Sequence, residues 1–318
     1  MTIDQINDIY LDLIIPVYKP DDKLYRLLGR INKQTIKPRN ILILHTVENI
    51  NNPSPLPIPK NMDISTKVFY VDKNDYDHGA TRGYGASLSE ADILMYMTQD
   101  AVPVDDYLIE NLLEPYKNKE VAASYARQLA DSKAGIIEAY TRSFNYPNES
   151  LIKSAKDIKT LGIKAFFCSN VCATYRRDVY ETLGGFVKKT IFNEDMIMAH
   201  TMICAGYKIA YQAKAKVIHS HKYSYLQQFS RNFDLGVSHR QYGRVFLGVS
   251  SESEGIRLLK SSIRYLINKK KYLLIPDLIL SSGLKYLGYK LGVNYNKLPK
   301  SFVVHWSMNK GYWRDGAK

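Results

Sequence analysis

Short apolar runs alternate with polar, helix-forming stretches along the first two thirds of the chain. The apolar runs cover residues 11–18, 41–44, 67–71 and 91–97. Between the first two runs, Leu24, Leu27, Leu28 and Ile31 recur at helical spacing, and Asp21-Asp22 can cap that helix. This strand–helix alternation predicts an α/β fold with a mostly parallel sheet and helices on both faces.

The pattern continues less regularly towards residue 225. We expect helices from Asp105-Asp106 to about Tyr116, at 176–183, from a cap at residues 193–195 to Gly206, and from about Leu226 onward. We expect a strand at 121–125, strand character in 166–175 and two short strands in 207–218. The organisation predicted is a catalytic domain over residues 1–225 followed by a helical region over residues 226–318.

The last third of the chain carries nearly all of its excess charge. Residues 222–318 hold 17 Lys or Arg and 5 Asp or Glu, a net of +12 out of +13. Such a charge implies an anionic partner: nucleic acid, acidic lipid or a pyrophosphate-bearing substrate. No recognisable nucleic-acid module accompanies it, so nucleic acid is not the expected partner.

The same region has an amphipathic pattern. Residues 256–267 are basic and amphipathic, and Lys269-Lys270-Lys271 follows them. The apolar runs 272–280 and 284–291 are too short and broken to span a bilayer. Such a segment can lie in a membrane interface. The alternative is a helical cap that packs on the core and exposes a solvated basic face.

Cysteine usage and the N-terminus indicate the compartment. Cys168, Cys172 and Cys204 are an odd number in a long chain, which suggests unpaired thiols in a reducing cytoplasm. Residues 1–12 contain acids and no apolar run of signal length, so no signal peptide is expected.

Candidate chemistry gathers just after strands and at helix starts. Asp100 follows the run 91–97; the other candidates are Asp77-His78-Gly79 with Thr81-Arg82, Glu194-Asp195, and His219 with His221. In an open α/β sheet such positions meet at one edge. Asp100 with a histidine would offer a carboxylate and an imidazole, which suit Mg²⁺ or Mn²⁺. Arg82, near a helix start, could hold a diphosphate. Asp195 or Glu194 could accept a proton. Taken singly, each group could instead only make a turn, cap a helix or end a strand.

The order of these groups resembles a known family. The groups follow one another in the order Pro16-Val17-Tyr18, Asp77-His78-Gly79 with Thr81-Arg82, Thr98 to Ala101, Glu194-Asp195, and His219 to His221. This order is similar to that of the GT-A glycosyltransferases of family 2, and most similar to that of bacterial rhamnosyltransferases of cell-wall rhamnan and O-antigen assembly. The resemblance covers nearly the whole chain. It implies a GT-A, Rossmann-like fold and an inverting transfer of sugar.

The resemblance also implies roles for individual residues. The catalytic residues are Asp195, as general base, and Glu194 beside it. The nucleotide-sugar contacts are Pro16, Val17, Tyr18, Asp77, His78, Gly79, Arg82, Gln99 and Asp100. The metal ligands are Asp100 with His219 or His221, and the spacing does not choose between the histidines. Arg231, at a basic helix start, and Ser169 with Asn170 are assigned to the diphosphate and acceptor.

Two residues depart from the family pattern. Thr98 stands where the first Asp of the Asp-x-Asp metal motif is expected, which implies weak metal binding or partial metal dependence. Gly83 follows Arg82 where many relatives have Asn, which implies a looser sugar contact.

The implied reaction is transfer of L-rhamnose from dTDP-β-L-rhamnose to a polyprenyl-diphosphate-linked glycan, with Mg²⁺ or Mn²⁺ as cofactor. The implied location is the cytoplasm, peripheral at the inner face of the cell membrane and in contact with anionic lipid; a homo-oligomer is left open. The alternatives are a family 2 transferase that uses a UDP-sugar, and a non-catalytic, membrane-associated glycan-binding subunit.

Overall fold

The computed structural model describes residues 9–246 and 252–314, and its internal contacts divide the chain into two units. The first unit comprises Met1–Ser132, Tyr146–Lys188 and Glu194–His219; the second comprises Lys133–Asn145, Lys189–Asn193 and Ser220–Lys318. The roles predicted for residues 1–225 and 226–318 stay predictions. The expected absence of a signal peptide concerns mainly residues 1–8, which lie outside the described residues, as do residues 315–318.

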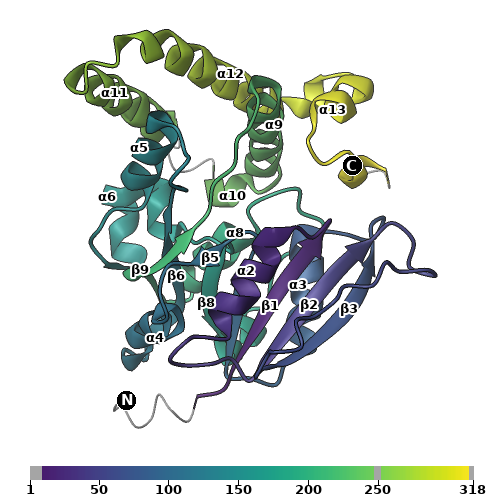
Figure 1. Cartoon of the computed structure of the whole chain (residues 1–318). Coiled ribbons are helices and arrows are strands. Elements are labelled where there is room, and N and C mark those ends of the chain that lie inside the picture. The colour runs from purple at the N-terminus through teal and green to yellow at the C-terminus, as the bar shows by residue number, and fades with distance from the viewer. Residues whose placement is uncertain (1–8, 247–251, 315–318) are drawn as a thin grey trace. The chain divides into compact units, whose positions relative to one another are not determined.

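The first unit is built on one mixed sheet. Its strands are β1 (Leu11–Tyr18), β2 (Asn40–Val47), β3 (Ser65–Asp72), β4 (Ile93–Met97), β5 (Val102–Pro103), β6 (Val121–Leu129), β7 (Leu151–Lys153), β8 (Cys172–Arg176) and β9 (Lys208–Ile218). They run in the order β3-β2-β1-β4-β8-β6-β9-β5, and β7 pairs with β9. Strands β3, β2, β1 and β4 are parallel, as predicted. Strand β8 lies antiparallel between β4 and β6 (Figure 1).

Helices cover both faces of this sheet, which confirms the predicted layering. The helices of the first unit are α2 (Asp22–Ile31), α3 (His78–Ser87), α4 (Leu108–Leu113), α6 (Ile158–Leu161), α7 (Arg177–Thr182) and α8 (Glu194–Cys204). Leu13 and Ile15 of β1 share a core cluster with the buried leucines of α2. Side chains alternate along a strand, so Ile14 faces the other side, where a Cβ on Gly85 of α3 would lie 2.5 Å from its side chain.

Two predicted elements were misplaced. Helix α4 begins at Leu108, not at Asp105-Asp106, because the Asp105 carboxylate accepts a hydrogen bond from the Tyr107 N–H at 3.1 Å and forms a turn instead of a cap. Strand character in 166–175 is confined to β8, since Phe166 ends a 3-10 helix and residues 167–171 form an irregular segment that ends in a turn.

Residues 208–218 form one strand rather than the two short strands expected. The register between β6 and β9 explains the misreading: Ala126 pairs with Gln212, but the next residue, Arg127, pairs with Lys216. Residues 213–215 therefore form a bulge that interrupts the period-two pattern without ending the strand.

The second unit is helical. Its helices are α5 (Ile136–Asn145), α9 (Tyr225–Gln241), α10 (Gly243–Phe246), α11 (Glu252–Asn268), α12 (Ile275–Val293) and α13 (Lys300–Trp306). A capping box between Ser224 and Gln227 starts α9 close to the predicted residue. The apolar runs 272–280 and 284–291 lie mostly in a single helix, α12, which begins at Ile275 after a 3-10 turn over Tyr272–Leu274. Pro276 does not interrupt α12, because it lies in the first turn, where a missing N–H costs no hydrogen bond. Among the described residues, no helix is both long and apolar enough to cross a bilayer.

Candidate functional site

Gln99 supports the loop that ends strand β1. Its Oε1 accepts a hydrogen bond from the Tyr18 N–H at 2.8 Å, and its Nε2 donates to the Tyr18 carbonyl oxygen at 3.2 Å. Lys19 then takes a left-handed φ of 49°. The amide of Gln99 is thus used on the chain itself. The nucleotide-sugar contacts predicted for Gln99, Tyr18, and Pro16 and Val17 in β1 stay predictions.

Asp77 and Gly79 build the start of α3. The Asp77 Oδ1 accepts hydrogen bonds from the backbone N–H groups of Gly79 at 3.0 Å and Ala80 at 2.7 Å. A Cβ on Gly79 would lie 1.8 Å from the carbonyl oxygen of Val187, so this close approach requires glycine. Asp77 is therefore a helix cap in this structure, and a ligand contact from this turn stays a prediction.

A buried ion pair joins α3 to α8. Arg82 Nη1 lies 3.2 Å from Glu194 Oε1, with both side chains 7% exposed, and Nη1 also donates to the His78 carbonyl oxygen at 3.0 Å. Asn170 Nδ2 donates to the same Glu194 oxygen at 3.1 Å. Burial raises the pKa of Glu194, but the positive charge of Arg82 together with His78 and the hydrogen bond from Asn170 outweighs burial and leaves that pKa lowered. Glu194 is therefore ionised at neutral pH.

Asp195, in the first turn of α8, has the opposite shift. Its Oδ2 accepts a hydrogen bond from the Asn170 N–H at 3.0 Å, and its Oδ1 accepts from the Met196 N–H at 2.8 Å. Burial, and next to it the negative charge of Glu194, raise the pKa of Asp195 to about 7. Two neighbouring carboxylates with diverging pKa values are typical of an acid–base site.

Asp100 and His219 form the centre of the predicted metal site. Asp100 Oδ1 lies 3.5 Å from His219 Nε2, and the two side chains are 15% and 8% exposed. His219 Nδ1 lies 3.0 Å from Gln128 Oε1. Because that oxygen can only accept, this contact places the proton on Nδ1 and leaves Nε2 as a ligand atom facing Asp100. His219 is the predicted histidine beside Asp100 within the first unit. A metal contact from His221, which belongs to the second unit, stays a prediction.

The donor set fits a divalent cation. One carboxylate with imidazole nitrogens suits a borderline ion such as Mn²⁺. Thr98, at the position where the resemblance expects an Asp, has a buried Oγ1 without a hydrogen-bond partner among the described residues. A buried hydroxyl in this state is a neutral oxygen available to a ligand.

The segment Ser169-Asn170 connects the two halves of the site. Ser169 Oγ lies 3.0 Å from Gln128 Nε2, whose other end holds His219. Asn170 contacts both acidic residues of α8. The predicted diphosphate or acceptor contacts of this segment stay predictions. Its structural role is visible, because it links Gln128, which contacts His219, to the carboxylates of Glu194 and Asp195.

Three supporting residues were missed from the sequence. Gln128 orients His219, and the Tyr175 hydroxyl donates to Asn170 Oδ1 at 2.8 Å. Buried Lys153 donates to the carbonyl oxygens of Phe167 and Lys164 at 2.5 and 3.0 Å, and burial lowers its pKa to about 7. A polar residue in an apolar strand is a weak signal that could have marked Gln128; nothing in the sequence pattern marks Lys153.

Arg231 was predicted at a helix start, and this position was wrong. It lies in the second turn of α9, whose N-cap is Ser224, and its guanidinium lies 4.6 Å from the centre of the Phe192 ring. Both residues belong to the second unit. A contact of Arg231 with a diphosphate stays a prediction.

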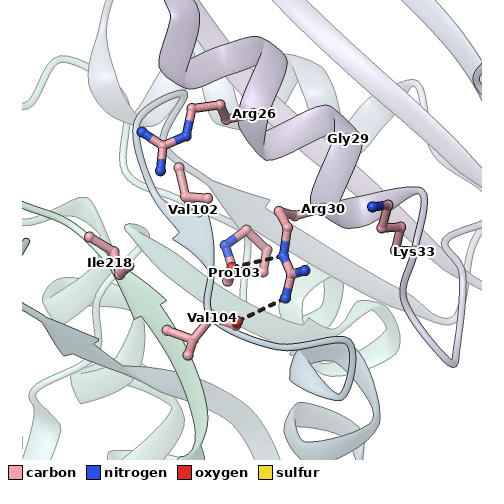
Figure 2. Close-up of a pocket in the computed structure, with 8 residues that line it drawn as sticks. All are labelled: Arg26, Gly29, Arg30, Lys33, Val102, Pro103, Val104 and Ile218. Carbon is pink, nitrogen blue, oxygen red and sulfur yellow. Dashed lines mark hydrogen bonds between the residues drawn. The ribbon is translucent and has the colours of Figure 1, made fainter.

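A separate groove of about 380 Å³ lies between α2 and β5. It is lined by Arg26, Gly29, Arg30, Lys33, Val102, Pro103, Val104 and Ile218, and Figure 2 shows Arg30 bonded to the carbonyl oxygens of Pro103 and Val104. No predicted site residue lines it. Its lining residues Val102 and Ile218 adjoin Asp100 and His219 in the sequence, but the groove itself contains no candidate catalytic or metal-binding side chain.

Comparisons with known proteins agree with the resemblance. The model of the family described as glycosyl transferase family 2 matches residues 12–184. The O-antigen chain rhamnosyltransferase RfbN of Salmonella typhimurium is 37% identical over 313 residues, 96% of each chain. The O-antigen chain rhamnosyltransferase WbaN of Salmonella anatum is 38% identical over 314 residues, 95% of each chain.

The fold has a counterpart among solved structures. The mannosyltransferase PcManGT from Pyrobaculum calidifontis, solved in complex with GDP-Man and Mn²⁺, has a TM-score of 0.55 and 12% identity. The alignment covers 96% of this chain and 84% of that chain. This likeness supports the predicted GT-A fold.

The ion pair between Arg82 and Glu194 gives a stability prediction. Arg82→Met leaves a buried carboxylate without its counter-charge, and we expect the free energy of unfolding to fall by about 3–5 kcal/mol in urea denaturation. The double variant Arg82→Met/Glu194→Gln should regain part of this loss. Arg177→Met is the control, because its pair with Glu181 is partly exposed and should change stability by about 1 kcal/mol or less. A double variant no more stable than Arg82→Met would contradict the role assigned to the pair.

Proposed function

The chain belongs to glycosyl transferase family 2, and from this premise we propose that it transfers L-rhamnose from dTDP-β-L-rhamnose to a hydroxyl group of a lipid-diphosphate-linked glycan. The names of the two Salmonella relatives support the sugar and a role in cell-surface polysaccharide synthesis. The observation that carries the reaction type is the Asp195 carboxylate, with its raised pKa, held by the Asn170 N–H.

Asp195 is the general base of this proposal. A carboxylate with a pKa of about 7 is ionised over much of the neutral range and is basic enough to accept the proton of the acceptor hydroxyl. The acceptor oxygen then bonds to the sugar C1 while the bond from C1 to the diphosphate oxygen breaks on the opposite face. The configuration at C1 inverts. Glu194 stays ionised beside Arg82 and acts on Asp195 through its charge.

Asp100 with His219 and His221 is the proposed site for Mg²⁺ or Mn²⁺. Such an ion supplies positive charge against the leaving diphosphate when bound. Gln128 holds the His219 ring so that Nε2 is the ligand atom. Thr98 offers only a neutral oxygen where a second carboxylate is expected, so the proposal includes weak metal binding.

Donor and acceptor contacts complete the proposal. The nucleotide-sugar contacts proposed are Pro16, Val17, Tyr18, Asp77, His78, Gly79, Arg82, Gln99 and Asp100, and those to diphosphate or acceptor are Ser169, Asn170 and Arg231. Arg82 supports this assignment: its buried Nε has no hydrogen-bond partner among the described residues, so one N–H remains for a ligand.

We place the protein in the cytoplasm at the inner face of the membrane, where its basic last third meets anionic lipid.

A panel of donors tests the proposed reaction. The assay follows transfer from dTDP-rhamnose, UDP-glucose, UDP-galactose and GDP-mannose to a synthetic lipid-diphosphate glycan, with Mg²⁺, with Mn²⁺ and with a chelator. The proposal expects product from dTDP-rhamnose with a divalent cation and a lower rate with chelator. Product from a UDP-sugar instead would keep the family and overturn the donor. No turnover of any donor would contradict the catalytic role.

The general base gives a second prediction. Asp195→Asn keeps the shape of the side chain but cannot accept the proton, so we expect kcat to fall by about 10²–10⁴-fold while donor binding, measured by calorimetry, is retained. Asp63→Asn is the control, since Asp63 is an exposed carboxylate paired with Lys37. A wild-type rate in Asp195→Asn would show that another group is the base.

A further inference from the structure

Helix α12 presents an apolar stripe to solvent. Its exposed residues recur at positions i, i+3, i+4, i+7, i+10 and i+11, which is one face of a helix. These residues are Pro276, Ile279, Leu280, Gly283, Tyr286 and Leu287. The remaining exposed residue of α12, Asp277, lies at i+1, outside this face, and its carboxylate accepts a hydrogen bond from the Tyr225 hydroxyl. Four residues of the stripe have large hydrophobic side chains that are about half exposed. Contiguous exposed apolar surface of this kind marks an interaction site.

The opposite face of α12 is fixed against α9, so the stripe cannot turn inward. A Cβ on Gly288 would lie 2.4 Å from the Phe229 carbonyl oxygen, and a Cβ on Gly292 would lie 2.0 Å from the Phe233 carbonyl oxygen. The two backbones are therefore in direct contact. Rotating α12 to hide its outer stripe would force larger side chains into this contact.

The turn that precedes α12 adds both charge and apolar surface. Lys269, Lys270 and Lys271 are exposed and are followed by Tyr272, 57% exposed, and Leu273, 94% exposed. At the far end of α12, Lys290 lies 5.5 Å from the centre of the Tyr286 ring. Lysines therefore flank the apolar stripe at both ends.

Helix α11 contributes a second row of positive charge. Lys260 and Arg264 are exposed one turn apart, and the exposed Ile256 and Ile267 lie at either end of this row. Figure 1 shows α11 and α12 as successive helices joined by the short turn. Exposed cations on α11 and in the turn thus accompany the apolar stripe of α12.

We propose that the outer stripe of α12 and the turn Lys269–Leu273 insert into the interfacial layer of an anionic lipid bilayer. Amphipathic helices with apolar residues on one face and cations beside it lie in this plane, with their lysine ammonium groups at the headgroups. Charge argues for lipid over a second copy of the chain, because two copies would bring like-charged lysines together. The inference rests on the peripheral membrane location in the proposed function and names the surface that makes it.

Vesicle sedimentation tests the proposal with two matched sets of variants. The apolar set is the triple variant Leu273→Gln/Leu280→Gln/Leu287→Gln. Its control is Leu226→Gln, which replaces an exposed leucine of α9. The charge set is Lys269→Gln/Lys270→Gln/Lys271→Gln, and its control, Lys297→Gln/Lys300→Gln/Lys310→Gln, removes the same charge from exposed positions elsewhere in the second unit. The vesicles are phosphatidylcholine with and without phosphatidylglycerol.

We expect binding of the wild type to the anionic vesicles only, weakened by salt. The apolar and charge sets should each lower binding at least tenfold, and both controls should bind within twofold of the wild type. In the variant Leu273→Trp, brominated lipids should quench the fluorescence of the introduced tryptophan, because that side chain would lie in the lipid layer. Wild-type binding by the apolar set, or an equal loss in both charge sets, would overturn insertion by this surface. A dimer in lipid-free solution that Leu280→Gln/Leu287→Gln dissociates would assign the stripe to a second copy.

Transfer to a water-soluble acceptor separates this inference from the proposed function. The apolar set should keep the wild-type rate in that assay, because its side chains are exposed and the proposed reaction assigns them no role. A loss of that rate would show misfolding, and the single variants Leu273→Gln and Leu280→Gln would then replace the set. If the wild type binds vesicles but turns over no donor, the reaction fails and the membrane surface stands.

Discussion

The buried ion pair between Arg82 and Glu194 is the interaction on which the rest of the site depends. It joins the helix that follows β3 to the helix that precedes β9, two segments more than 100 residues apart in the sequence. Because Arg82 keeps Glu194 ionised, Glu194 places a full negative charge beside Asp195. Together with burial, that charge brings the pKa of Asp195 close to neutral. One pair thus contributes to both stability and chemistry.

The antiparallel strand β8 gives the site its second constraint. It lies between β4 and β6, and Thr98 donates its N–H to the Val171 carbonyl oxygen at 3.2 Å. This pairing brings residues 169–171 beside the end of β4, where Asp100 follows. Ser169 and Asn170 can then reach Gln128 on one side and the acids of α8 on the other. The Asp100–His219 pair and Asp195 are held together by hydrogen bonds rather than by sequence proximity.

Patterns that reflect burial were predictable from the sequence. The alternation of apolar and polar stretches correctly predicted β1, β2, β4 and α2, because each of these elements must bury an apolar face against the same core. Polar groups that follow strands were expected to gather at one edge of the sheet, and Asp100 and His219 do lie together. The resemblance supplied the order of the polar groups, and the comparisons confirm the family.

Features that depend on tertiary contacts were not predictable. Arg82 was expected to face a diphosphate, but nothing local shows that Glu194, 112 positions later, pairs with it. Asp105 carries a good cap side chain, yet it accepts a hydrogen bond from the Tyr107 N–H and forms a turn before α4 begins. The position of β8 and the shifted pKa of Asp195 likewise arise from segments brought together only by the folded sheet.

The pH dependence of kcat/KM for the wild type and Glu194→Gln tests the central claim most directly. Asp195 must be deprotonated to act, so wild-type activity should fall as pH drops through about 7, the raised pKa of that carboxyl. Glu194→Gln removes the neighbouring negative charge but leaves Asp195 buried, so the midpoint should move to lower pH without reaching the value of an exposed aspartate. An unchanged midpoint in Glu194→Gln would contradict the coupling between the two carboxylates.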